Sequence, residues 1–213
     1  MKGKYIVVEG IEGAGKTNAT SLIEQVLKDH FISKIDTREP GGTPVAEALR
    51  GIVKADGFSY EKEELYDKSE LLILYAARHQ LVEGVIKPAL ESGKWVIGDR
   101  HDLSTRAYQG GGRGIPDETI EVISNLTLDG FKPDLTIYMD VEPKIGLERA
   151  RGRGELDRIE QMDLEFFERV RAKYLELATS DPNTIIIDAS KDIKSVQNDI
   201  MIKLSLWLQD NIV

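Results

Sequence analysis

The chain has 213 residues, of which 41% are hydrophobic and 31% charged, so it can bury one sizeable core and is unlike disordered, collagen-like or fibrous proteins. Its net charge of −9 argues against a surface for nucleic acid or anionic membranes, because such partners are attracted by extended basic patches. The lack of cysteine excludes disulfides, thiolate metal sites and a cysteine nucleophile. We expect one cytoplasmic domain over residues 1–213, because neither a signal-peptide core nor a long uncharged apolar stretch is found.

The first strong motif follows an apolar run at residues 5–8 and precedes a segment with apolar residues at helical spacing. It matches the phosphate-binding loop G-x-x-x-x-G-K-[ST] at every fixed position, as Gly10-Ile11-Glu12-Gly13-Ala14-Gly15-Lys16-Thr17. Such a loop turns backbone N–H groups toward one anion, and the helix after it adds the positive end of its dipole. We expect Lys16 to reach the β- and γ-phosphates and the Thr17 hydroxyl to bind Mg²⁺. A glycine-rich turn without a ligand is the alternative, but a chance match would arise in under about one in a hundred chains of this length.

Strand-length runs alternate with helical patterns along the whole chain. We expect strands over residues 5–8, 34–38, 95–97, 135–139 and 184–187, with helices between them and a final helix over 193–207. This alternation predicts an α/β, three-layer phosphate-loop fold, in which a five-stranded parallel sheet carries helices on both faces. Ligands of such sheets bind beyond the carboxyl ends of the strands, where Gly10, Glu39, Asp99 and Asp140 fall.

Three segments between the strands have distinctive patterns. Residues 69–90 read as one long helix that is apolar nearly all round between residues 71 and 77, so it should be buried in the core or against another subunit. Residues 109–114 are glycine-rich and predict a loop between two helices. Residues 57–64 are polar and predict a surface connection.

A charged, glycine-punctuated segment at about residues 149–158 predicts a mobile lid loop. It carries Arg149, Arg151, Arg153 and Arg158. A charge run is usually just a solvated face. Phosphoryl transfer, however, needs cations that arrive as charge shifts onto the transferring group, and a closing lid with an arginine would supply one.

Two further arginines lie where a ligand could reach them. Arg78 shares the apolar face of its helix, so it needs either a ligand or a structural ion pair with a carboxylate such as Glu39 or Asp99, and we favour the ligand. At the end of the third strand, Asp99 can organise Mg²⁺ or its waters and Arg100 can hold an acceptor phosphate bidentately. The alternative is that Asp99 and Arg100 merely pair with each other.

A short helical segment after Arg100 offers hydroxyl and amide groups suited to a sugar or a base. These groups belong to Ser104, Thr105, Tyr108 and Gln109. Taken alone, such residues are more typical of a capped, solvated helix.

Together these motifs resemble thymidylate kinases, and closely the bacterial form, over essentially the whole chain. The resemblance is carried by residues 10–17, Glu39-Pro40-Gly41-Gly42-Thr43, Tyr75-Ala76-Ala77-Arg78, Asp99-Arg100-His101, Ala107-Tyr108-Gln109-Gly110 and residues 151–158. It implies a homodimer packed through helices and the reaction ATP + dTMP → ADP + dTDP with Mg²⁺, Thr17 and Asp99 serving the metal. Neither nucleic acid nor a membrane is expected as a partner.

The same resemblance implies roles for individual residues. Glu12 would lie near the sugar and phosphate of dTMP, Arg78 and Thr105 would contact thymine, Arg100 would hold the dTMP phosphate, and Tyr108 would exclude a ribose 2′-hydroxyl. The full set expected around dTMP is Glu12, Glu39, Pro40, Arg50, Leu74, Arg78, Arg100, Ser104, Thr105, Tyr108 and Gln109.

The chain departs from the family pattern at two places. Leu74 stands where family members often have a phenylalanine that stacks on thymine, so apolar contact would replace stacking. Gly13-Ala14 stands where some relatives have a basic residue in the phosphate loop. As in the bacterial class, the lid would then supply the missing cation, with Arg153 the first choice and Arg149 the second.

Two other classes of function share part of this pattern. A kinase for another nucleoside monophosphate or for a deoxynucleoside would share the phosphate loop, Arg100 and the lid. A GTP-dependent switch would need D-x-x-G and N-K-x-D elements, and the chain contains neither.

Overall fold

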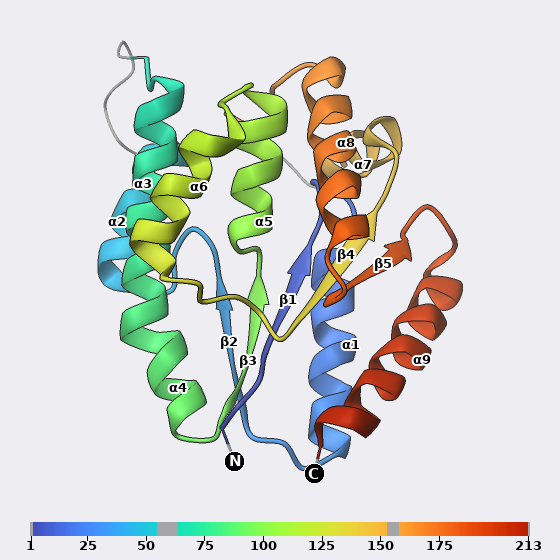
Figure 1. The fold of residues 1–213 in the computed structure, drawn as a ribbon. Coiled ribbons are helices and arrows are strands. Elements are labelled where there is room, and N and C mark those ends of the chain that lie inside the picture. The colour runs from blue at the N-terminus through green and yellow to red at the C-terminus, as the bar shows by residue number, and fades with distance from the viewer. Residues whose placement is uncertain (1, 55–63, 153–157, 213) are drawn as a thin grey trace.

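The computed structural model describes residues 2–54, 64–152 and 158–212. Five parallel strands form one sheet in the order β2-β3-β1-β4-β5 (Figure 1). The strands are β1 Tyr5–Glu9, β2 Lys34–Arg38, β3 Trp95–Asp99, β4 Leu135–Asp140 and β5 Thr184–Asp188. The predicted five-stranded parallel sheet is therefore confirmed, and all its carboxyl ends meet at one edge.

Helices connect the strands and place the loops at that edge. They are α1 Lys16–Asp29, α2 Pro44–Lys54, α3 Asp67–Leu81, the π-helical turn η1 Val82–Ile86, α4 Lys87–Glu91, α5 Asp102–Thr105, the π-helical turn η2 Arg106–Gly112, α6 Asp117–Leu128, α7 Pro143–Arg151, α8 Leu164–Ser180 and α9 Ile193–Asn211. Thr43 caps the start of helix α2, because its hydroxyl accepts a hydrogen bond from the Ala46 N–H at 3.1 Å.

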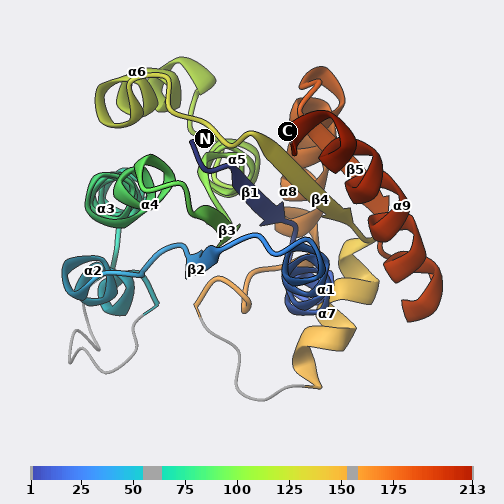
Figure 2. The ribbon, with the colours of Figure 1, turned by 90° about the horizontal axis from the view of Figure 1, so that it is seen from below.

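The central strand β1 is buried on both faces of the sheet. Tyr5 and Val7 pack into a cluster with apolar residues of α3, α4 and α6, whereas Ile6 and Val8 pack into a second cluster with α1, α8 and α9. Alternate residues of a strand point to opposite faces, so two separate apolar layers cover the sheet. Figure 2 shows α1 on one side of the strands and α6 on the other, as the three-layer prediction requires.

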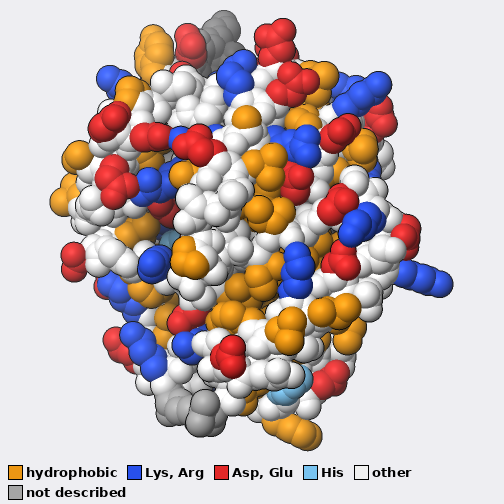
Figure 3. Space-filling model, turned by 45° about the vertical axis from the view of Figure 1, so that its right-hand side comes forward, with side chains coloured by type: hydrophobic (Ala, Val, Ile, Leu, Met, Phe, Trp, Pro, Cys, Tyr) orange, Lys and Arg blue, Asp and Glu red, His pale blue; other side chains and the backbone are white. Residues whose placement is uncertain are grey.

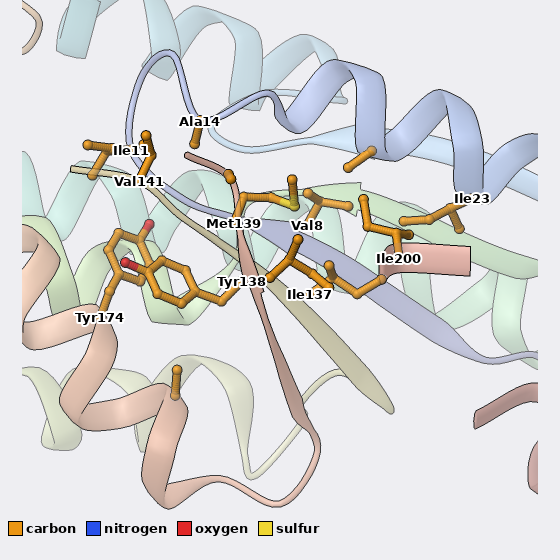
Figure 4. Packing of buried hydrophobic residues seen from close by; sticks show 14 of the residues in the cluster. Val8, Ile11, Ala14, Ile23, Ile137, Tyr138, Met139, Val141, Tyr174 and Ile200 are labelled. Atoms are coloured by element: carbon orange, nitrogen blue, oxygen red, sulfur yellow. The ribbon is translucent and has the colours of Figure 1, made fainter. Parts of the chain in front are cut away.

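The second cluster also holds the phosphate loop in place. Ile11 and Ala14 of the loop are 1% and 2% exposed and belong to the same cluster as Met139 and Val141 at the end of β4 (Figure 4). The Tyr138 and Tyr174 rings stack beside them, with centroids 4.9 Å apart. Core packing thus fixes the position of the loop that the sequence assigns to phosphate.

The predicted glycine-rich loop at residues 109–114 is wrong for residues 109–112, which continue the helix as the π-helical turn η2. Residues 113 and 114 lie outside any helix, as predicted. The reason for the helical conformation is tertiary packing, because a Cβ on Gly112 would lie 2.4 Å from the Phe166 ring of α8. Glycine here allows two helices to approach closely. A glycine-rich sequence pattern alone does not distinguish such close helix packing from a flexible loop.

Two other local predictions need correction or fall outside the described residues. The first part of the predicted lid, including Arg149 and Arg151, forms the last turn of α7. Arg153 lies outside the described residues, as does most of the predicted connection at 57–64. Helix α3 is not buried all round, because Leu71 is 1% exposed whereas Leu72 is 56% exposed.

Charged side chains of both signs are interspersed over the face in Figure 3, where the described residues form no extended basic patch. Among the described residues, no helix is long and apolar enough to cross a membrane.

Candidate active site

The phosphate loop has the backbone geometry of an anion cradle. Gly13 has a φ of 74°, and a Cβ there would lie 1.9 Å from the Gly146 carbonyl oxygen, so only glycine fits. Helix α1 starts at Lys16, whose Nζ donates hydrogen bonds to the carbonyl oxygens of Gly10 at 3.0 Å and Ile11 at 3.1 Å. The ammonium group is thus held across the loop, next to the positive end of the helix dipole.

The surroundings of Lys16 change its titration. Burial lowers its pKa, the positive charge of Arg100 adds to that effect, and Glu12 and Asp99 oppose it, with a net pKa of about 8. Lys16 and Arg100 both line the same cleft. Two cations converge there, as binding of a multiply charged anion requires.

Arg100 follows β3 in a left-handed backbone conformation with a φ of 72°. Its Nη2 donates to Glu12 Oε1 at 2.5 Å, its Nη1 donates to Ser104 Oγ at 3.1 Å, and its guanidinium lies 5.1 Å from the centroid of the Tyr108 ring. Burial alone lowers the pKa of Arg100, but Tyr108 and Glu12 outweigh it and raise that pKa. The guanidinium pairs with Glu12 rather than with Asp99, contrary to the simple alternative considered for the sequence.

Glu12 is held from two sides. The Tyr108 hydroxyl donates to Glu12 Oε2 at 2.5 Å, while Arg100 occupies Oε1. Burial raises the pKa of Glu12, but Arg100 and Lys16 lower it more, so the net shift is downward and the carboxylate is ionised. The Tyr108 ring packs edge-on against Phe167 and Tyr174, which fixes the position of its hydroxyl.

Arg78 makes the structural ion pair that the sequence left open. Its Nε donates to Glu39 Oε2 at 2.6 Å, and its Nη2 donates to Thr105 Oγ1 at 2.7 Å and to the His101 carbonyl oxygen at 3.1 Å. The side chain is 3% exposed, yet Arg78, Glu39 and Thr105 all line the central cleft. The ion pair and a place at the ligand cleft therefore coexist, and contact with a base stays a prediction.

Glu9 is a site residue that the sequence analysis missed. Its carboxylate is fully buried and accepts hydrogen bonds from the His101 N–H at 2.7 Å, the Ser104 hydroxyl at 2.6 Å and the Tyr174 hydroxyl at 3.0 Å. Burial raises the pKa of Glu9. The bonds to His101 and Ser104 fix the segment that follows Arg100. A charged residue ending an otherwise apolar strand was the signal available in the sequence.

Two oxygen-bearing side chains in the cleft suit a divalent cation. Asp99 Oδ1 is buried and has no hydrogen-bond partner among the described residues, and the Thr17 hydroxyl lines the same cleft. Carboxylate, hydroxyl and phosphate oxygens are the ligands that Mg²⁺ prefers. The described residues contain no group of three or more His, Asp or Glu residues able to hold a metal, so phosphates and water would complete the coordination.

The arginines at the two described ends of the predicted lid contact different parts of the chain. Arg149 lines the cleft and its Nη1 donates to the Ala189 carbonyl oxygen at 2.9 Å. Arg158 instead pairs with Glu70 of α3, and its Nε donates to the Val53 carbonyl oxygen at 3.2 Å. Arg149 is therefore the described lid arginine placed at the cleft.

One cleft of about 820 Å³ brings together most of the predicted site residues. They are Glu12, Gly13, Ala14, Gly15, Lys16, Thr17, Glu39, Pro40, Arg50, Leu74, Arg78, Asp99, Arg100, Ser104, Thr105, Tyr108, Gln109 and Arg149. Gly10 and Ile11 do not line it, because they form the buried base of the phosphate loop.

A family model described as thymidylate kinase matches residues 8–200, which include the phosphate loop and every described residue of the cleft named above. The chain belongs to the thymidylate kinase family. The thymidylate kinase of Vibrio parahaemolyticus serotype O3:K6 (strain RIMD 2210633) is 57% identical over 209 residues, covering 98% of each chain. Those of Vibrio vulnificus (strain YJ016) and Vibrio campbellii (strain ATCC BAA-1116) are each 56% identical over 209 residues, covering 98% of this chain and 97% and 98% of their own. The resemblance seen in the motifs is thus confirmed over nearly the full length.

Proposed function

We propose that this chain transfers the γ-phosphoryl group of ATP to dTMP, giving ADP and dTDP. The observation that carries the proposal is the match of residues 8–200 to the thymidylate kinase family model. The cleft supports the proposal, because residues of the phosphate loop and the Arg100–Glu12 pair line one space. This space is large enough for the reacting phosphates of two nucleotides. In-line transfer needs this arrangement, with a donor phosphate and an acceptor phosphate held end to end.

The donor and acceptor phosphates would be held from opposite sides. The phosphate loop, residues 10–17, would bind ATP, with Lys16 at its β- and γ-phosphates. Arg100 would hold the dTMP phosphate and exchange part of its pairing with Glu12 for it. Both cations would then stabilise the charge that spreads over the transferring group.

The other end of the cleft would bind the nucleoside of dTMP. Arg78, Thr105 and Gln109 would contact the base, Leu74 would give it apolar contact, and Tyr108 would stand against the 2′ position of the sugar. Glu39, Pro40, Arg50 and Ser104, which also line the cleft, would complete this binding site.

Mg²⁺ is proposed as the metal that accompanies ATP. Thr17 and Asp99 would hold it, directly or through water. When bound, such an ion neutralises phosphate charge and orients the transferring group.

The titration of Lys16 predicts a pH dependence. At pH values below its pKa of about 8, the Lys16 ammonium group is charged. As the pH rises through that value, the free enzyme loses the charge that attracts phosphate. The value of kcat/KM for ATP should therefore fall above pH 8, whereas kcat should fall only at higher pH, because bound phosphates stabilise the ammonium form. Steady-state kinetics between pH 6.5 and about 9.5 measure both profiles. A flat kcat/KM profile over that range would contradict the assignment.

We propose that Arg149 adds a cation at the transition state, as the second candidate after Arg153, which the sequence analysis placed first. Arg149→Ala should lower kcat by about tenfold or more and change the KM for dTMP little, because the contact would be made mainly in the transition state. Arg151→Ala is the matched control, since Arg151 lies in the same helical turn but is exposed and outside the cleft. A kcat within about twofold of the parent for Arg149→Ala would remove it from the mechanism.

The assembly and location follow as further proposals. We propose a single cytoplasmic domain that forms a homodimer through α2, α3 and α6. These neighbouring helices carry exposed apolar side chains, among them Val45, Leu72, Val122 and Leu126, which a symmetric partner would cover. Sedimentation velocity measures this assembly, and a monomer at micromolar concentration would exclude it.

A panel assay tests the proposed reaction. ATP consumption would be coupled to ADP detection with dTMP, dUMP, dCMP, dAMP, dGMP and thymidine as acceptors, each with and without Mg²⁺. We expect the highest kcat/KM with dTMP. A preference for another monophosphate, or for the nucleoside, would favour a different nucleotide kinase.

A further inference from the structure

Glu70 is a fully buried carboxylate that no part of the proposed mechanism uses. It lies on α3 with 0% exposure and accepts hydrogen bonds from two other parts of the chain. Gln109 Nε2 donates to Oε1 at 2.6 Å, and Arg113 Nη2 donates to Oε2 at 3.3 Å. Arg158 also pairs with Oε2. A buried carboxylate is costly without such partners, so the two guanidinium groups compensate its negative charge.

The charge of Glu70 fixes which way the Gln109 amide points. An ionised carboxylate can only accept hydrogen bonds, so the NH₂ group of Gln109 must face it. The amide oxygen then faces the opposite way, and it has no hydrogen bond to another described residue. Gln109 is 2% exposed and lines the cleft. It therefore presents an acceptor, not a donor, to a ligand there.

Arg78 supplies the complementary half of this pattern. A guanidinium has donors only, so Arg78 offers donors and Gln109 offers an acceptor, and both residues line the cleft. Thymine and uracil match this pair of groups, because a carbonyl oxygen lies next to a ring N–H in both. Cytosine carries an amino group next to an unprotonated ring nitrogen, so its pattern is reversed and would leave buried polar groups unpaired.

We propose that Glu70 is a positioning residue that sets the hydrogen-bonding direction of Gln109. Through it, the cleft selects pyrimidines with a ring N–H over cytosine. This inference rests on the proposed function and deepens it, since it names the residue that reads one edge of the acceptor base.

The test compares dTMP with dCMP in the parent and in Glu70→Gln. The substituted amide can accept or donate, so Gln109 becomes free to rotate and to meet cytosine. We expect the ratio of kcat/KM for dTMP to that for dCMP to fall by about tenfold or more, the effect of one mismatched buried hydrogen bond. Asp67→Asn is the matched control, because Asp67 lies on the same helix and pairs with Arg113 Nε at 3.3 Å but does not contact Gln109. Its ratio should stay within about twofold of the parent.

A second substitution separates positioning from a structural role. In a Gln109→Met background, Glu70→Gln should leave the substrate ratio unchanged, because the group through which Glu70 acts is gone. A structural role would lower the melting temperature and both kcat/KM values together and leave the ratio intact in every background, which would overturn the inference. If Glu70→Gln does not fold, Glu70→Asp is used for the same comparison. The shorter side chain keeps the negative charge but moves the carboxylate away from the Gln109 amide. An unchanged ratio in that variant also overturns the inference.

The proposed function and this inference fail differently. A parent protein that does not phosphorylate dTMP rejects both. A parent that prefers dTMP, together with a Glu70→Gln variant of the same ratio, rejects only the role of Glu70.

Discussion

Lys16→Ala is expected to lower kcat by at least about a hundredfold, the effect of removing a fixed cation from a transferring phosphate. The Lys16 ammonium is held by the carbonyl oxygens of Gly10 and Ile11 at the start of α1, so it is positioned before any phosphate arrives. The phosphate loop contains no second lysine that could replace Lys16. The loop itself should persist, because Ile11 and Ala14 anchor it in the core.

Single-turnover and steady-state kinetics measure this loss, with circular dichroism as the check on folding. Lys28→Ala is the matched control, because Lys28 lies in the last turn of the same helix, is exposed, and is remote from the cleft. Its kcat should equal that of the parent within about twofold. Turnover of Lys16→Ala at the parent level would reject the phosphate-loop assignment.

The second large effect is expected for Arg100→Ala, which should lower kcat by about a hundredfold or more and raise the KM for dTMP by about tenfold. Both parameters should change, because Arg100 would hold the acceptor phosphate in the ground state as well as in the transition state. The change also leaves the Glu12 carboxylate beside the acceptor without its guanidinium partner. Repulsion between Glu12 and the dTMP phosphate should add to the rise in KM.

Arg100→Lys refines this prediction. Lysine keeps the positive charge but cannot bind a phosphate bidentately, so most of the KM effect should be recovered and less of the kcat effect. Arg171→Ala is the control, since Arg171 pairs with Asp140 at the end of β4 and does not line the cleft. If Arg100→Ala raises the KM for ATP and leaves that for dTMP unchanged, Arg100 belongs to the donor site instead.

The sequence by itself determined the features that depend on local spacing. The phosphate loop, the five strands and the helices around them follow from contiguous motifs and from the periods of apolar residues, which act within a few residues. The carboxyl-end positions of Glu39, Asp99 and Arg100 follow as well, because a parallel sheet brings its strand ends to one edge. These features place most of the predicted residues in one cleft.

Local spacing misjudged segments whose conformation depends on a neighbour. Residues 109–112 are glycine-rich and resemble a loop, but contact between Gly112 and Phe166 of α8 keeps them helical. Arg149 and Arg151 resemble part of a mobile loop, although they complete the last turn of α7. Leu72 belongs to an apolar run, but it lies on the outer side of α3.

Only the tertiary structure decided which charged groups are partners. Glu12 meets Arg100 and Tyr108 across 88 and 96 residues, and Glu70 meets Gln109 and Arg158 across 39 and 88 residues. Chain-local patterns carry no information at such separations, because each carboxylate could pair with several arginines. The strand order and the packing of α8 against η2 and of α6 against α3 select among these pairings. Burial reinforces the selection, because an unpaired charge in the interior would be costly.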